Sequence, residues 1–336
     1  MTVLITGGTG FVGMTLAEEL TDQGIDVVLL ARRPLLPEMD KSLEGRKGNY
    51  AFFKGNILDP GSLDEAVKKH RIDSIVHAAV ITPDIEREKE ESKLIARVNY
   101  MGTIEVLEAM KRNEVGRLVY TSSGAVYGDA SFESDWLEED KNYPKPNALY
   151  GINKFAAERA ALRYKELFDL DIVVGRVGGV FGAWERYTGV RDTLSGPFFA
   201  TRAAVLGQKP RVLKPDSKDW VYSRDIAKSL SAMLTAGKFG HDVYNLSSGF
   251  VWSGDAWCGK LKEAYPGFDY TVVDDPAEAD ITDFGELDRN PMNIDRLEND
   301  IGYTPVYDLE RSFEDYMSWI GGVSDFWVNP PDSNPA

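Results

Sequence analysis

The sequence contains few of the residues that form disulfides and metal centres. Its 336 residues include one cysteine, Cys258, and three histidines, His70, His77 and His241. A single cysteine excludes an internal disulfide and a cysteine-rich zinc site, and we expect Cys258 to be a small buried side chain. The histidines do not follow a metal-binding spacing such as H-E-x-x-H. We therefore expect no metal ion.

Long hydrophobic runs and an excess of positive charge are also lacking. Each apolar stretch is short and interrupted by glycine or charge, so no segment is long enough to span a membrane. Acidic residues outnumber basic residues by 54 to 38, which argues against binding to nucleic acid. Met1 leads directly into a strand-like segment without a basic and apolar leader. These features predict a cytoplasmic protein with neither membrane nor nucleic-acid partners.

Strand-like and helix-like segments alternate along the first half of the chain. Short β-branched runs predict strands at 2–6, 26–31, 51–54, 73–77, 116–122 and 171–176. Apolar residues at helical spacing predict helices at 11–23 and at about 60–70, 90–113 and 149–168. Continuous apolar strands alternating with helices are typical of an α/β fold with a parallel sheet covered on both faces.

A glycine-rich turn follows the first expected strand. Gly7, Gly10 and Gly13 lie where this strand ends and the next helix begins. In a dinucleotide-binding turn, such glycines allow the tight bend, the approach of the pyrophosphate and close helix packing. The free N–H groups of the helix N-terminus add a partial positive charge. The sequence therefore predicts a Rossmann-type doubly wound parallel sheet, with the dinucleotide bound by Gly7, Thr9, Gly10, Phe11, Val12 and Gly13.

Beyond residue 176 the alternation loosens into loops. A strand–helix pair at 220–234 and a strand at 242–246 follow, and the last expected helix covers 309–320. We expect residues 1–176 and 218–247 to form the dinucleotide-binding domain. Residues 177–217 and 248–322 would form a smaller C-terminal α+β substrate portion, and 323–336 a flexible tail.

The second expected strand ends without an acidic residue. A carboxylate there would bind the ribose hydroxyls and repel a 2′-phosphate, but this chain has Arg32 and Arg33. Arginine recognises phosphate with two N–H groups. We therefore favour NADP(H) as the cofactor, with NAD(H) as the alternative.

A tyrosine and a lysine four residues apart form the candidate catalytic pair. Tyr150 and Lys154 lie in an expected helix and so share one face. The same spacing in Tyr50 and Lys54 falls on an expected strand, where it separates the residues by about 13 Å. A nearby ammonium and a positive nicotinamide would lower the pKa of the phenol, which is otherwise near 10. Ser123, at the end of the fifth strand, would hydrogen-bond the same substrate oxygen, so we predict these three residues to be catalytic.

Together these residues resemble the extended short-chain dehydrogenase/reductase superfamily, in particular its NAD-dependent epimerase/dehydratase family. The resemblance covers almost the whole chain and includes residues 55–59, 76–79, 98–99, 122–128, 220–227 and 243–248. It implies hydride transfer in which Tyr150 is the acid/base, Lys154 lowers its pKa and binds the nicotinamide ribose, and Ser123 orients the substrate oxygen. It also implies a homodimer formed through helices at about 100–112 and 150–168.

The resemblance implies further cofactor contacts. Asn56 and Ile57 would flank the adenine, although the usual residue at position 56 is an acid. Residues that would line the nicotinamide side or lie near the active-site helix are Ala78, Ala79, Val80, Asn99 and Val177.

Departures from the family pattern narrow the expected substrate. The 4,6-dehydratases carry an acid pair directly after the catalytic hydroxyl, where this chain has Gly124 and Ala125, so we do not expect dehydration. Nucleotide-sugar enzymes have an asparagine where this chain has Gly179 and an arginine where it has Lys218. Their second diphosphate-binding arginine has no counterpart before 278–280. Because an unpaired diphosphate charge is costly, we expect a smaller substrate without a nucleotide.

The loop after the sixth strand is the candidate substrate pocket. By resemblance it belongs to the substrate-binding region, where Trp184 would stack on a sugar ring or another flat face. Arg186 and Arg191 would suit a carboxylate, a phosphate or a sulfonate. An exposed loop with surface ion pairs is the alternative interpretation.

The leading hypothesis for the function is an NAD(P)-dependent oxidoreductase. Its substrate would be a small polar hydroxyl or carbonyl compound, such as a sugar or sugar acid. A sugar epimerase that retains its NAD is the alternative, because the same three residues serve both reactions. The intact set of Ser123, Tyr150 and Lys154 argues against a third interpretation, a non-catalytic redox sensor or scaffold on the same fold.

Overall fold

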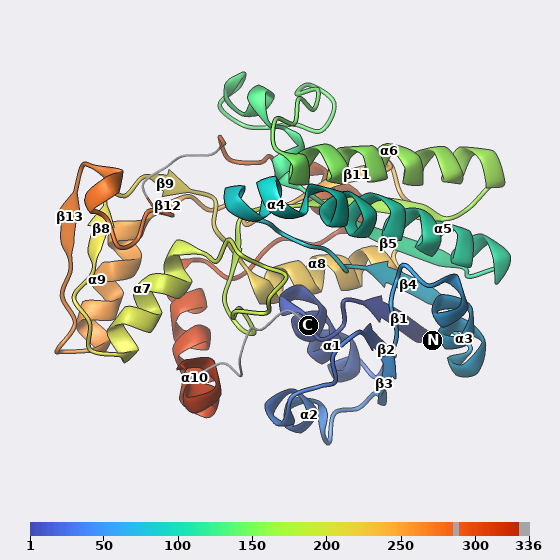
Figure 1. Ribbon diagram of the computed structural model, residues 1–336, viewed down its shortest axis with the longest axis horizontal. Coiled ribbons are helices and arrows are strands. Elements are labelled where there is room, and N and C mark those ends of the chain that lie inside the picture. Colours follow the sequence, from blue (N-terminus) through green and yellow to red (C-terminus); the bar gives the residue numbers. More distant parts are fainter. Residues whose placement is uncertain (285–288, 329–336) are drawn as a thin grey trace.

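A seven-stranded parallel sheet forms the centre of the molecule (Figure 1). The computed structural model describes residues 1–284 and 289–328. The spatial order of the strands is β11-β6-β5-β4-β1-β2-β3. In chain order they are β1 Thr2–Thr6, β2 Asp26–Ala31, β3 Tyr50–Lys54, β4 Ser74–His77, β5 Arg117–Ser123, β6 Ile172–Val177 and β11 Val243–Leu246. The predicted fold class is confirmed, and the first six strands lie within one residue of their predicted ends.

The order of the strands reverses beside β1. This strand pairs in parallel with β2 on one side and with β4 on the other. The chain therefore leaves the two neighbouring carboxyl ends in opposite directions, which opens a crevice where ligands bind in open α/β sheets.

Helices cover both faces of this sheet. They are α1 Phe11–Asp22, α2 Pro37–Leu43, α3 Pro60–His70, α4 Ile85–Ala96, α5 Gly102–Arg112, α6 Leu149–Phe168 and α8 Ser223–Thr235. Val3 and Ile5 of β1 pack in the hydrophobic cluster that contains α1 and α8, whereas Leu4 packs in the cluster that contains α3, α5 and α6. Because alternate residues of a strand point to opposite faces, this two-sided burial explains the continuous apolar strands.

Two helical segments differ from the predictions. The helix expected at 90–113 begins at Ile85 and consists of α4, the π-helical turn η1 Arg97–Met101 and α5. The short helix α2 was not predicted. It begins with Pro37, which suits a first helical turn because proline lacks an N–H group that would otherwise remain unpaired.

The C-terminal part packs against the same hydrophobic cluster as α1 and α8. Its helices are α7 Gly196–Val205, α9 Gly254–Ala264 and α10 Leu309–Val328, and short ladders join β7 Val180–Phe181 to β10 Val221–Tyr222, β9 Ser217–Lys218 to β12 Trp252–Ser253, and β8 Arg211–Leu213 to β13 Thr271–Val273. The remaining turns are the 3-10 helices η2 Gly124–Val126, η3 Asp129–Phe132 and η4 Pro276–Glu278 and the π-helical η5 Leu297–Ile301. Aromatic rings form much of its core: the ring of Phe181 lies 5.2 Å from that of Trp257 and 5.5 Å from that of Trp252. Cys258 is fully buried beside them, as predicted.

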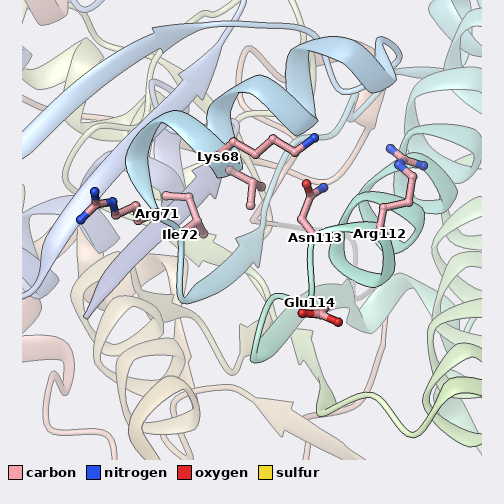
Figure 2. Close-up of a pocket in the computed structure, with 7 residues that line it drawn as sticks. Lys68, Arg71, Ile72, Arg112, Asn113 and Glu114 are labelled. Carbon is pink, nitrogen blue, oxygen red and sulfur yellow. The ribbon is translucent and has the colours of Figure 1, made fainter.

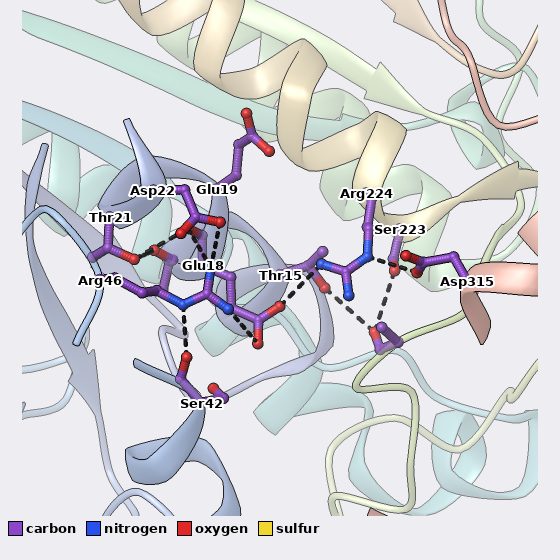
Figure 3. Close-up of polar contacts among 12 residues, drawn as sticks. Thr15, Glu18, Glu19, Thr21, Asp22, Ser42, Arg46, Ser223, Arg224 and Asp315 are labelled. Atoms are coloured by element: carbon purple, nitrogen blue, oxygen red, sulfur yellow. Dashed lines mark hydrogen bonds and ion pairs between the residues drawn. The ribbon is translucent and has the colours of Figure 1, made fainter. Parts of the chain in front are cut away.

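A cluster of charged residues joins α1, α8 and α10 (Figure 3). Glu18 of α1 is buried, and its carboxylate lies 3.3 Å from Arg224 of α8 and 3.4 Å from Arg46. Figure 3 shows Arg224 between Glu18 and Asp315 of α10, whose carboxylate it reaches at 2.7 Å. The guanidinium of Arg224 thus links α1 to α10.

The last helix is longer than predicted, and the expected tail over 323–336 is wrong at its start. Helix α10 is kinked at Val323, whose backbone angles are not helical, and it continues to Val328, where Trp327 packs in the core. Trp327 is fully buried, its ring lies 5.1 Å from that of Phe198, and its Nε1 donates to the carbonyl of Glu185 at 3.1 Å. The rest of the expected tail, 329–336, lies outside the described residues.

Replacing Trp327 with alanine should destabilise the fold by about 3–5 kcal/mol, since it empties a large buried site. Thermal unfolding followed by circular dichroism would report this as a lower Tm. Trp136→Ala, at a tryptophan that is 41% exposed, is the matched control and should change Tm little. Equal effects of the two substitutions would contradict the anchoring role of α10.

Candidate active site

The glycine turn after β1 has the geometry that its motif requires. Gly7 has φ +69°, and its N–H donates to the carbonyl of Leu30 at 2.9 Å. The N–H of Gly10 donates to the carbonyl of Gly7 at 2.8 Å, and α1 begins at the next residue. A Cβ on Gly13 would lie 2.4 Å from the Gly7 carbonyl oxygen, so α1 packs on the turn only with glycine there. The helix N-terminus therefore opens directly onto the crevice.

The backbone atoms of Leu29 and Ala79 lie so close to the turn that they exclude side chains at Gly8 and Gly7. A Cβ on Gly8 would lie 2.7 Å from the Cα of Leu29, so this glycine is needed as well, although the motif spacing does not single it out. A Cβ on Gly7 would lie 2.8 Å from the Cα of Ala79, the second residue after β4. The turn and the segment after β4 therefore pack directly against each other at the switch point.

Asn99 and His77 hold the β4 wall in place. The buried amide of Asn99 accepts from the N–H of Ile81 and donates to its carbonyl, both at 2.8 Å. His77 hydrogen-bonds Thr6 at 2.6 Å and Thr103 at 3.1 Å. Burial, together with the charge of Lys154, lowers the pKa of His77 to about 3. His77 is therefore neutral and joins β1, β4 and α5.

The expected adenine end lies beyond β2 and β3. Ile57 is buried, whereas Asn56 is exposed and accepts from the N–H of Leu58 at 3.0 Å. Arg32 and Arg33 are exposed after β2, at the same edge of the sheet as the glycine turn. The structure therefore places two arginines, Arg32 and Arg33, near the expected position of the adenosine ribose.

The predicted catalytic residues come from β5 and α6. Ser123 is the last residue of β5, and its register partner in β6 is Val177, which is also a predicted cofactor contact. Tyr150 and Lys154 share one face at the start of α6. Lys154 is buried, donates from Nζ to the carbonyl of Thr121, and lies 4.6 Å from the centre of the Tyr120 ring. The carboxyl ends of β5 and β6 and the first turn of α6 thus meet beside the crevice.

The electrostatic environment of this pair differs from the expected one. Burial raises the pKa of Tyr150, while hydrogen bonding by Ser123 and Thr82 and the charge of Arg191 lower it. Burial also lowers the pKa of Lys154 to about 7, against the opposing charge of Glu158. At neutral pH the phenol is protonated, and the lysine is close to its own titration.

A buried ion pair lies behind Lys154. Glu158, one helical turn further along α6, accepts from both Nη2 and Nε of Arg176 at 2.6 and 3.1 Å. Ser122 donates to the same carboxylate at 2.8 Å. Sequence reasoning did not identify this pair, although its signal was present, because Glu158 stands four residues after Lys154 on the same helix face.

The loop 184–195, which we call the strap, crosses the carboxyl edge of the sheet between α4 and α1 (Figure 1). Arg186 donates to the carbonyl of Thr9 at 2.9 Å, and Arg33 donates to the carbonyl of Thr188 at 3.1 Å. Further along, the N–H of Thr82 donates to the carbonyl of Val190 at 2.8 Å. The strap is thus tied to the segments after β1, β2 and β4, which surround the crevice.

The structure buries two of the predicted substrate contacts on the strap, and it rules out the predicted stacking role of Trp184. Trp184 has no exposed surface, has φ +70°, and packs its ring 5.4 Å from that of Trp319. It belongs to the core and is not open to a sugar ring. Arg186 is buried against Thr9, and burial together with the charge of Arg33 lowers its pKa to about 10. Arg186 therefore lies beside the glycine turn.

The carboxylate of Glu185, which the sequence analysis did not identify, binds both ends of the strap. Glu185 is fully buried and accepts from Nη2 of Arg191 at 2.9 Å. It also accepts from the N–H and Oγ of Ser195 at 2.9 and 2.6 Å. Burial raises the pKa of Glu185, while the charge of Arg191 lowers it. Both ends of the strap therefore converge on one acid.

Comparison with known proteins identifies the family. A family model described as "NAD dependent epimerase/dehydratase family" matches residues 3–247. The chain belongs to this family. The expected resemblance is thus confirmed.

Two curated relatives are distant in sequence but match along nearly the whole chain. One, named UDP-glucose 4-epimerase, from Neisseria gonorrhoeae, is 30% identical over 95% of this chain and 97% of its own length. Another, named sterol-4-alpha-carboxylate 3-dehydrogenase, decarboxylating, from Candida albicans, is 26% identical over 95% and 97%. Among solved structures, an epimerase from Methanothermobacter thermautotrophicus is 25% identical, has a TM-score of 0.81, and covers 97% of this chain and 93% of its own.

The position where the family resemblance places a dehydratase acid is filled by other groups. A Cβ on Gly124 would lie 2.9 Å from the sulfur of Met292 and 3.1 Å from Nε of Arg289. The guanidinium of Arg289 is buried and pairs with Asp219 at 2.8 Å. Sequence reasoning missed Arg289, because its loop is distant in the chain from Ser123. Lys218, which stands where the nucleotide-sugar enzymes have an arginine, donates to the carbonyl of Asp283 at 3.2 Å.

A surface cavity of about 370 Å³ lies elsewhere (Figure 2). Figure 2 shows it between the carboxyl ends of α3 and α5, lined by side chains such as Lys68, Arg71 and Arg112. Because these helix ends precede β4 and β5, the cavity lies at the sheet edge opposite the glycine turn.

No helix among the described residues is both long and apolar enough to cross a membrane.

Gly13→Ala should weaken cofactor binding, because the new Cβ displaces the Gly7 carbonyl and the helix N-terminus. We expect the Kd for NAD⁺ or NADP⁺, measured by calorimetry, to rise about tenfold or more, equivalent to a loss of about 1.4 kcal/mol. Gly259→Ala is the control, because a Cβ at this position in α9 meets nothing within 4 Å. Wild-type affinity in Gly13→Ala would show that the turn does not bind the dinucleotide.

Proposed function

We propose that this protein is an NAD(P)-dependent oxidoreductase that transfers hydride between nicotinamide and a small polar hydroxyl or carbonyl compound. The observation that carries the proposal is the position of Ser123, at the end of β5, and Tyr150, at the start of α6, on the edge of the sheet that also bears the glycine turn. Hydride transfer needs an acid/base next to a bound nicotinamide, and these side chains lie at the sheet edge that bears the glycine turn.

In this mechanism the chain's own residues move the proton and hold the substrate. A bound nicotinamide supplies the acceptor or donor of the hydride. In oxidation, Tyr150 takes the proton of the substrate hydroxyl as the C–H bond gives up its hydride, and the C=O bond forms. In reduction, Tyr150 returns a proton to the carbonyl oxygen. Ser123 hydrogen-bonds that oxygen in both directions, and Lys154 binds the nicotinamide ribose.

The substrate we propose is a sugar or sugar acid without a nucleotide. The Lys218 ammonium is engaged with the Asp283 carbonyl and lies 5.5 Å from the centre of the Trp220 ring. Arg289 forms its ion pair with Asp219. These cations already have protein partners, which argues against a diphosphate in the site. The Candida relative, whose name gives a dehydrogenase of a sterol carboxylate, supports a hydride-transfer reaction of this kind.

A sugar epimerase that retains its NAD is the second candidate. The observation that favours it is the strap, whose contacts at Thr9, Thr82 and Arg33 would hinder exchange of a bound dinucleotide. The gonococcal relative, named an epimerase, supports the same candidate. The absorbance ratio at 260 and 280 nm of the purified protein separates the two candidates, because retained cofactor raises it.

We also propose the homodimer that the family resemblance implies. The helices expected to form it carry exposed apolar side chains, with Met101 43% and Ile152 45% exposed. Covering such side chains is a typical source of association free energy.

For the cofactor, we predict that NADP(H) binds more tightly than NAD(H). Arg33 and Arg186 lie close enough for the charge of one to lower the pKa of the other, and an added phosphate would relieve this repulsion. Arg33→Ala should cost about tenfold in NADP⁺ affinity in calorimetric titrations and leave NAD⁺ affinity nearly unchanged. Arg163→Ala, at an exposed arginine on α6, is the control. Tighter binding of NAD⁺ to the wild type would refute the preference.

Tyr150→Phe should abolish turnover while keeping cofactor affinity. We expect the rate to fall by about 10²–10⁴-fold, because the variant lacks the acid/base. Sugars and sugar acids would be screened by absorbance at 340 nm, and each mixture would be analysed by NMR for stereoisomers. A wild-type rate in Tyr150→Phe would overturn the mechanism for both candidate reactions.

A further inference from the structure

We propose that Arg186 binds a phosphate group of the dinucleotide, so that the strap belongs to the cofactor site. This inference rests on the proposed function, because it takes the glycine turn as the place where the dinucleotide binds. It also changes the assignment of the residue. The sequence analysis placed Arg186 against the substrate, whereas its hydrogen bond to Thr9 places it against the turn.

The strap is fastened on both sides of Arg186. Directly before the strap, the carbonyl of Ala183 accepts from Oγ1 of Thr15 in α1 at 3.3 Å. After Arg186, the carbonyl of Thr188 accepts from Arg33, beyond the end of β2, at 3.1 Å. The strap therefore runs from the side of α1 to the end of β2, and Arg186 lies between these two points.

The guanidinium of Arg186 is held at the glycine turn itself. Nη2 donates to the carbonyl of Thr9 at 2.9 Å, and Nη1 donates to the carbonyl of Trp184 at 3.4 Å. Both acceptors are neutral carbonyl oxygens, which orient the guanidinium without adding a negative charge. Thr9 directly precedes Gly10, the N-cap of α1. The buried cation therefore lies beside the helix N-terminus at which the pyrophosphate is expected.

The N-terminus of α1 receives no acceptor from its own side chains. Gly10 makes no side-chain cap, and the first turn of α1, which the structure describes in full, contains no acidic residue. The N–H groups that begin an α-helix need acceptors from elsewhere. A phosphate bound there would satisfy these N–H groups and would pair with the adjacent guanidinium of Arg186.

More positive charge surrounds the same turn. The guanidinium carbon of Arg191 lies 5.2 Å from the centre of the ring of Phe11, the first residue of α1. Glu185, the acid next to Arg186 in the chain, is bound to Arg191 at 2.9 Å. Burial and the charge of Arg33 lower the pKa of Arg186 to about 10, so the surrounding protein disfavours its charged form. A phosphate beside the guanidinium would offset both effects.

The test is calorimetric titration with NADP⁺ and with NAD⁺, on protein from which any bound dinucleotide has been removed. In Arg186→Met we expect the Kd to rise about 10- to 100-fold, the loss typical of a hydrogen bond to a charged group. Arg186→Lys should lose less affinity, because it keeps the charge. A loss for NADP⁺ alone assigns the contact to the 2′-phosphate, and a loss for both dinucleotides assigns it to the pyrophosphate.

Two controls separate a phosphate contact from a loop fastening. Ser195→Ala removes a 2.6 Å hydrogen bond to Glu185 that holds the strap, but it keeps every arginine, so it should change the Kd less than Arg186→Met. Arg163→Met, at an exposed arginine on α6, should leave the Kd unchanged. Raising the ionic strength should weaken binding to the wild type more than binding to Arg186→Met, because salt screens a contact between opposite charges.

Two results would overturn the proposal. One is an unchanged Kd for both dinucleotides in Arg186→Met. The other is an equal loss in Arg186→Met and Ser195→Ala, with the salt dependence of the wild type, which would mean that Arg186 acts only through the folding of the strap. Circular dichroism on each variant establishes that it is folded. Failure of the proposed function is distinct, since the wild type itself would then bind neither dinucleotide.

Discussion

The parallel pairing of β1 with both β2 and β4 is the constraint on which the other features of the site depend. It brings every carboxyl end of the sheet to one edge and makes the chain diverge on either side of β1. Gly7 then approaches Ala79 so closely that no side chain fits between them. The helix N-terminus of α1 and the ends of β5 and α6 that carry Ser123 and Tyr150 all lie along that edge.

Two of the buried ion pairs lie near the same edge. Glu158 with Arg176, and Glu185 with Arg191, place carboxylates in the interior, where each must be paired to offset its desolvation. The first pair lies behind Lys154, and the second fastens the strap. Such pairs add little net stability compared with apolar residues of similar size, but breaking one leaves an uncompensated buried charge. They therefore specify the position of the lysine and of the strap more than they stabilise the fold.

The strap unites the two ends of the proposed reaction. Arg186 contacts the glycine turn through Thr9, while Arg191 pairs with Thr82 in the segment after β4. The far end of the chain supports this arrangement, because Trp327 of α10 donates to the carbonyl of Glu185. The terminal helix thus has a direct connection to the site, although it is distant from it in sequence.

The sequence by itself determined the sheet, the glycine turn and the pairing of Tyr150 with Lys154. Each of these has a local sequence signal: apolar runs of strand length, glycines at the end of a strand, and two residues one helical turn apart. The same kind of signal was present for Glu158 and was not used.

Only the tertiary structure decided the positions and contacts of Trp184, Arg186, Arg191, Glu185 and Arg289. The local sequence around a loop tryptophan or arginine does not indicate whether its side chain points into the core, toward the glycine turn or toward another loop. The direction depends on partners such as Trp319, Thr9 and Thr82, which lie far away in the chain and are brought close only by folding. Long-range contacts of this kind leave no periodicity in the sequence. The path of the strap is therefore determined by the tertiary structure and not by local sequence.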